Sequence, residues 1–199
     1  MTEQPPLLTP PAAGDWGPDE YAAVGALFGA PAEDVPRAGS GDPRDPLKFD
    51  ILGVLVRHPQ LAREFLAYNG FLLQRGELSL RLRELVILRL AHARRSAFFW
   101  AEHHRVATSG GMDAADIDRL ARGNDEFDGV DAVVLEATDE MLAAARIQPQ
   151  TWHRLVEHVG THQAIEVIFV FGTYALLATA METWQLAVPP GSPALPGAS

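Results

Sequence analysis

A glutamate within an apolar helix face is a candidate for acid–base chemistry. Glu84 shares a stripe at helical spacing with four apolar residues, Leu80, Ile87, Leu88 and Ala91. A carboxylate in such a place costs several kcal/mol unless it is paired, hydrogen-bonded or protonated. Two interpretations stay open, a structural ion pair with an arginine such as Arg81 or Arg89, and a group that takes part in acid–base catalysis.

Two adjacent histidines follow on the next predicted helix. The first, His103, shares its stripe with Phe99, Trp100, Val106 and Ala107, so we expect it to point inward. The second, His104, lies about 100° further round, where it borders the site or faces solvent. Because adjacent helical residues cannot aim at one point, they do not form a joint metal site. An inward histidine is either a satisfied core residue or a site residue.

Other chemistries lack their residues. The chain has no cysteine, which excludes disulfides, thiolate metal sites and thiol redox catalysis. The only lysine, Lys48, lies beside prolines, so we discount Schiff-base chemistry. We expect Ser96 to cap the helix that follows it, with its hydroxyl occupied by backbone N–H groups, and no GxSxG motif is present. No histidine–carboxylate cluster suggests a metal ion, and no phosphate-binding loop suggests a nucleotide. We therefore expect no cofactor and no metal.

Charge and hydropathy limit the partners. The net charge of −10 and the lack of a basic stripe argue against nucleic acid. The uncharged run Val167–Met181 is shorter than the roughly 20 residues that span a bilayer, so it predicts a buried core helix or a subunit interface, and no membrane partner. The N-terminus shows neither the basic nor the apolar region of a signal peptide, so we expect a cytoplasmic protein.

The elements that must position these residues are helices. No run alternates with period two, so the predicted fold class is all-α. We expect one domain over residues 18–187, with flexible tails at 1–17 and 188–199, which are rich in Pro, Gly, Ala and Ser. Capping residues and breakers predict helices over 18–29, 46–58, 59–76, 79–93, 97–109, 113–122, 131–145, 149–159 and 161–187.

One long segment is similar to a known family. The stretch "RGELSLRLRELVILRLAHARRSAFFWAEHHRVATSGGMDAADIDRLARG" resembles the carboxymuconolactone decarboxylase family, whose superfamily includes the alkylhydroperoxidase D-like proteins. The resemblance extends over about residues 45–189. It implies an alkylhydroperoxidase D-like helical bundle that assembles as a homo-oligomer, a trimer or hexamer, with sites near subunit contacts.

The resemblance also gives several positions a role. The thiol branch of the superfamily carries a glutamate, a CxxC motif and a histidine, and these slots fall on Glu84, Ser96, Phe99 and His103. Without the two cysteines, a thiol relay is excluded. The decarboxylase-like branch often shows a YEW…H pattern. Here Phe98 and Phe99 replace its phenol and carboxylate, which implies a drier pocket.

The function implied by this resemblance is a cofactor-independent lyase or isomerase. Glu84 and His103 would act as the acid–base pair on a small or medium hydrophobic carbonyl compound or lactone carboxylate. The other residues expected to contact this small-molecule substrate are Arg89, Arg94 and Arg95, for a carboxylate, and Phe98, Phe99, Trp100 and His104. The alternative is a non-catalytic oligomeric binding or scaffold protein. An open pocket that joins Glu84 and His103 would favour the enzyme, and a cavity filled by Phe98 and Phe99 would favour the scaffold.

Overall fold

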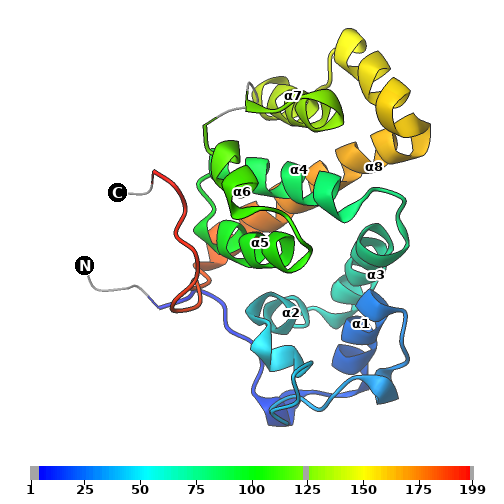
Figure 1. Ribbon diagram of the computed structural model, residues 1–199. Helices are drawn as coiled ribbons and strands as arrows, with labels where there is room; N and C mark the ends of the chain where they lie inside the picture. The colour runs from blue at the N-terminus through cyan, green and yellow to red at the C-terminus, as the bar shows by residue number, and fades with distance from the viewer. Residues whose placement is uncertain (1–4, 123–125, 198–199) are drawn as a thin grey trace. The chain divides into compact units, whose positions relative to one another are not determined.

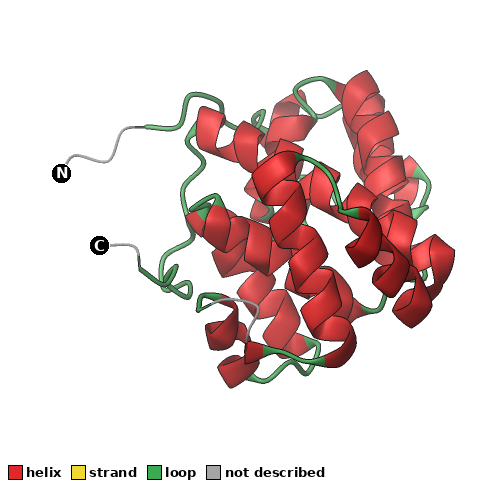
Figure 2. Ribbon diagram, turned by 90° about the horizontal axis from the view of Figure 1, so that it is seen from above, coloured by secondary structure: helices red, strands yellow, loops and turns green. Residues whose placement is uncertain are grey.

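The computed structural model describes residues 5–122 and 126–197 (Figure 1). Every regular element in these ranges is helical, which confirms the predicted all-α class (Figure 2). The internal contacts divide the chain into two compact units. Unit 1 runs to Gly76 and includes Thr183–Leu186, and unit 2 comprises Glu77–Glu182 and the residues from Ala187 onward. The expected division into one domain with two flexible tails stays a prediction.

Unit 1 contains three α-helices. They are α1 (Pro18–Phe28), α2 (Asp50–Leu55) and α3 (Pro59–Gly70), and a single π-helical turn at Phe71–Arg75 follows α3. Short 3₁₀ turns lie at Ala13–Asp15, Ala32–Asp34 and Pro46–Lys48. The backbones of α1 and α3 approach so closely that a Cβ at Gly70 would lie 2.1 Å from the carbonyl oxygen of Leu27. Only glycine fits at this crossing.

The helix predicted over 46–58 is divided in two. Asp45 accepts a hydrogen bond from the Leu47 N–H at 3.0 Å and starts a 3₁₀ turn. The backbone of Phe49 then becomes extended, with φ −121° and ψ 90°, before α2 begins. This backbone break, which the hydrophobic pattern does not encode, is why the single predicted helix was wrong.

The N-terminal segment of unit 1 is held by hydrogen bonds of its backbone to other parts of that unit. The N–H of Leu7 donates to the Trp184 carbonyl at 2.9 Å, and Arg57 donates to the Thr9 carbonyl at 2.8 Å. The indole of Trp16 is buried against Tyr21, with 5.4 Å between the ring centroids. Trp16 is therefore part of the core of unit 1.

Unit 2 holds the residues that the sequence singled out. Its helices are α4 (Leu80–Ala93), α5 (Ala97–Ser109), α6 (Ala114–Leu120), α7 (Gly129–Ala144) and most of α8 (Pro149–Trp184). Two predicted caps are confirmed, because Ser79 accepts from the Leu82 N–H at 3.3 Å and Asp113 accepts from the Ala115 N–H at 2.9 Å. α4 packs against both α5 and α7 (Figure 1). Most of its side chains are buried.

α8 is broken near its start. Gly160 has φ 79° and ψ 166°, which separates the two helical segments that the sequence predicted on either side of it. By length and composition, α8 is the one helix among the described residues that could cross a membrane, with a mean hydropathy of 1.8 in its most apolar window. Half of that window is buried inside the protein. Its buried residues include Val167, Val170, Tyr174 and Leu177, at the helical spacing of a core helix.

Glu166 of α8 fixes the start of α4. Its two carboxylate oxygens accept the backbone N–H groups of Glu77 and Leu78 at 3.0 and 2.7 Å. The residue is 9% exposed, so these bonds are shielded from water. This contact ties the segment before α4 to the helix that crosses the unit.

We expect Glu166→Ala to lower the free energy of unfolding by about 3 kcal/mol, because two backbone donors lose a charged acceptor. Urea unfolding measures this change. Glu157→Ala, an exposed change on the same helix, is the control and should leave stability nearly unchanged. Equal effects of the two substitutions would show that Glu166 does not hold the start of α4.

Candidate active site

Glu84 and His103 meet in the interior of unit 2. Glu84 Oε2 lies 2.7 Å from His103 Nδ1, although the two residues belong to α4 and α5. Glu84 is fully buried and His103 is 8% exposed. Against a carboxylate, the ring carries its proton on Nδ1 and donates it, which leaves the lone pair of Nε2 free to accept a proton. The arrangement is that of a histidine base oriented by a carboxylate.

Arg83 is the arginine that pairs with Glu84. Its Nε lies 3.3 Å from Glu84 Oε1, so each carboxylate oxygen has its own partner. The sequence had suggested Arg81 or Arg89 for this pair, and that suggestion is wrong. The guanidinium of Arg81 binds Asp131 at 2.6 Å and Asp116 at 2.8 Å. Arg81 thus links α4 to α6 and α7.

The three arginines expected to bind a substrate carboxylate lie elsewhere. Arg89 pairs with Asp139 at 2.6 Å and donates to the Leu120 carbonyl at 2.7 Å, so its guanidinium is engaged within the fold. Arg94 and Arg95 are exposed in the turn between α4 and α5. Arg95 also donates to the Gly197 carbonyl at 3.1 Å. In the described part of the chain, none of the three contacts the Glu84–His103 pair.

The aromatic rings of Phe99 and Tyr174 pack against His103. The Phe99 ring centroid lies 5.9 Å from the imidazole centroid, and Phe98 meets Phe99 edge to face at 5.5 Å. Both phenylalanines are buried. Tyr174 of α8 packs perpendicular to the imidazole, with centroids 4.8 Å apart. The pair therefore lies in a dry environment, as the two phenyl replacements had suggested.

Tyr174 was not among the site residues predicted from the sequence. Its only signal was a phenol inside the uncharged run that became the core of α8. Burial, together with the nearby Glu84 carboxylate, raises the pKa of Tyr174, and Arg83 opposes this shift. The side chain consequently stays a neutral phenol, able to donate a hydrogen bond.

Trp100 and His104 lie on an adjoining face of α5. The indole of Trp100 packs between the rings of His92 and His104, at centroid distances of 6.0 and 6.3 Å. Burial, with Arg89 and Arg95 nearby, lowers the pKa of His92. His104 is partly exposed and borders Trp100, and it does not contact Glu84.

Ser96 does not cap α5 as expected. Its hydroxyl accepts no bond from the first turn of the helix, and the Oγ atom is buried without a hydrogen-bond partner among the described residues. The Trp100 Nε1 atom is also buried without a hydrogen-bond partner among the described residues. Most buried polar atoms in proteins are hydrogen-bonded, so both atoms are exceptions.

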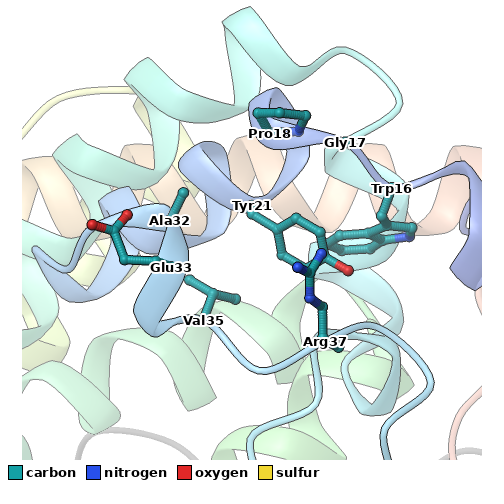
Figure 3. A pocket seen from close by; sticks show the side chains of 8 residues that line it. All are labelled: Trp16, Gly17, Pro18, Tyr21, Ala32, Glu33, Val35 and Arg37. Carbon is teal, nitrogen blue, oxygen red and sulfur yellow. The ribbon is translucent and has the colours of Figure 1, made fainter.

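Two further features of the described residues lie apart from this pair. No group of three or more His, Asp or Glu side chains in this part of the chain could hold a metal ion. Unit 1 carries a pocket of about 380 Å³, drawn in Figure 3, with Trp16 and Tyr21 in its wall. The Arg37 guanidinium lies 5.4 Å from the Tyr21 ring centroid at this pocket. None of the residues that line it was predicted as a site residue.

The Glu84–His103 contact predicts a strong coupling in a double-mutant cycle. We expect Glu84→Met and His103→Leu each to cost about 3 kcal/mol, because each leaves a buried polar partner alone, and the double variant to recover about 2 kcal/mol of the sum. Urea unfolding of the four proteins measures the coupling.

The exposed pair Glu102–Arg105, at 2.9 Å, is the control for this cycle. Its coupling should stay below about 0.5 kcal/mol, since solvent screens it. Additive losses at Glu84 and His103 would mean that the buried contact contributes nothing specific.

Comparison with known proteins agrees with the resemblance noted above. The sequence model of the carboxymuconolactone decarboxylase family matches residues 59–144, so this part of the chain is similar to that family. The matched segment includes Glu84, Ser96, Phe99 and His103, while Tyr174 lies beyond it. No curated protein and no solved structure matches the chain.

Proposed function

We propose that this chain, with its carboxymuconolactone decarboxylase family segment at residues 59–144, is a cofactor-independent lyase or isomerase that uses Glu84 and His103 as an acid–base pair. The observation that carries the proposal is the 2.7 Å contact between Glu84 Oε2 and His103 Nδ1 in a buried setting. The match to the family model supports the reaction class, and the geometry supports the roles of the two residues.

In this proposal His103 moves the proton and Glu84 orients the ring. The carboxylate holds the Nδ1–H, so Nε2 is the atom that takes a proton from substrate carbon or returns one to it. Once Nε2 is protonated, the Glu84 carboxylate stabilises the imidazolium. Arg83 binds the second oxygen of Glu84 and fixes its orientation.

The proposed substrate is a small or medium hydrophobic carbonyl compound or lactone carboxylate. In a decarboxylation, the bond from carbon to the carboxylate breaks, carbon dioxide leaves, and the electron pair passes into the adjacent carbonyl as an enolate. His103, protonated at Nε2 by solvent before the substrate binds, then delivers that proton to the enolate carbon and returns to its neutral form. In an isomerisation, the same nitrogen removes a proton and returns it at another carbon. The rings of Phe99 and Tyr174 favour an apolar substrate body.

We expect Glu84→Gln and His103→Ala to slow turnover by about a hundredfold or more, the usual contribution of a positioned acid–base group. Proton–deuterium exchange next to the carbonyl, followed by NMR over a panel of aryl ketones, lactones and β-keto acids, provides the assay. Glu102→Gln on α5 and His153→Ala, at an exposed histidine of α8, change the same residue types away from the pair and should keep full exchange. Full activity in both site variants would refute the proposed roles.

A non-catalytic oligomeric binding or scaffold protein is the second candidate. The close packing of Phe99 against both His103 and Tyr174 favours it, because these rings occupy the space beside the imidazole. The exchange assay separates the two candidates. Binding of panel compounds without any exchange in the wild type would favour the scaffold.

We also propose that the chain forms a homo-oligomer through α8. The exposed apolar residues of this helix share one face, and they are Ile165, Ile168, Phe169 and Leu176. Their spacing of three, four and seven residues makes a continuous stripe on the surface of unit 2. Such a stripe is typical of a helix that packs against another copy.

Leu176→Glu should reduce the mass of the particle in solution, because a charge at this position opposes burial of the stripe. Size-exclusion chromatography with light scattering measures that mass. Leu61→Glu, which places the same charge at an exposed leucine of α3, is the control. An unchanged mass for Leu176→Glu would place the subunit interface elsewhere.

A further inference from the structure

Tyr174 brings a phenol to the Glu84–His103 pair from a helix that lies outside the family match. Its ring stands at 90° to the imidazole of His103 and at 82° to Phe99, with centroid distances of 4.8 and 5.6 Å. The residue is 4% exposed. The ring of Tyr174 is therefore part of the immediate surroundings of His103.

The hydroxyl of Tyr174 can act as a hydrogen-bond donor. Burial of the side chain and the nearby Glu84 carboxylate raise the pKa of Tyr174, so the phenol stays protonated. A phenol in an apolar setting usually uses its O–H in a hydrogen bond. Tyr174 thus offers a neutral donor next to the imidazole of His103.

Two other polar atoms of unit 2 are buried without a hydrogen-bond partner in the described part of the chain. They are Ser96 Oγ and Trp100 Nε1. The indole N–H can only donate, and the serine hydroxyl can donate or accept. A ligand group that matches such donors, and the phenol of Tyr174, is an oxygen that accepts.

We propose that the Tyr174 hydroxyl binds the carbonyl or enolate oxygen of the substrate and thereby selects carbonyl compounds over hydrocarbons of the same shape. This inference rests on the proposed function for the location of the site. A fixed donor at the oxygen where negative charge develops stabilises an enolate in a dry site more than it does in water. It also gives this chain a phenol beside the histidine, although Phe98 occupies the slot where the decarboxylase-like branch carries one.

Binding of two matched probes tests the inference without turnover. 4-Fluoroacetophenone carries the acceptor oxygen, and 1-ethyl-4-fluorobenzene has nearly the same shape without it. Fluorine NMR titration gives the affinity of each probe for the wild type and for Tyr174→Phe. We expect the variant to bind the ketone about three- to tenfold more weakly, the loss of one hydrogen bond, and to bind the hydrocarbon within about twofold of the wild type.

Tyr21→Phe is the matched control. The Tyr21 hydroxyl accepts the Ala38 N–H at 3.1 Å within unit 1, so this substitution removes a phenol hydroxyl from another part of the chain. It should leave the affinity for both probes unchanged.

Three results would overturn the role of Tyr174. They are an equal loss for both probes in Tyr174→Phe, no loss for either, and a wild type that binds the ketone no more tightly than the hydrocarbon. The proposed function fails separately, when Glu84→Gln and His103→Ala keep full exchange. Selective loss of ketone affinity in Tyr174→Phe would then still establish the hydroxyl as the oxygen-binding group.

Discussion

A carboxylate without any contact with solvent determines much of the arrangement in unit 2. Glu84 lies in the middle of α4, where nearly every neighbour is apolar and buried. Its charge must be compensated from within the fold, since an isolated buried carboxylate costs far more than one helix can offset. Arg83 supplies one partner and His103 the other, and the second partner requires α5 to pack against α4 in one register.

The remaining ion pairs of α4 connect it to α6 and α7 and help to fix its position. Arg81 binds Asp116 and Asp131, and Arg89 binds Asp139, so α4 is connected to α6 and α7 by paired charges. Glu166 of α8 fixes the backbone just before α4, because its carboxylate accepts two backbone N–H groups there. These contacts are only partly buried at the arginines, and their main effect is on geometry. They leave Glu84 facing α5, which is the condition for an oriented imidazole.

The dry surroundings of the pair have two consequences that act in opposite directions. Aromatic rings exclude water and strengthen every interaction that a polar substrate group makes with His103 or Tyr174. The same rings occupy space, because Phe99 packs against both residues. An enzyme and a scaffold therefore share this core, and the difference between them is whether a substrate reaches Nε2 of His103. The neutral phenol of Tyr174 beside His103 favours a site that receives a ligand oxygen.

The amino-acid sequence was sufficient to predict the helical class, the capping of α4 and α6, the break at Gly160 and the inward direction of Glu84 and His103. These follow from periodicity and from local backbone chemistry, which neighbouring residues encode. The family resemblance could also be found from the sequence, because the residues that carry it lie in one continuous stretch. The packing of the helices was needed to show that Arg83 pairs with Glu84, that Arg89 pairs with Asp139, and that the Ser96 hydroxyl does not cap α5. It also brings Tyr174 into contact with His103, although the two residues are far apart in the sequence. Contacts of this kind depend on how helices pack, and packing is set by the whole core and not by spacing along one helix.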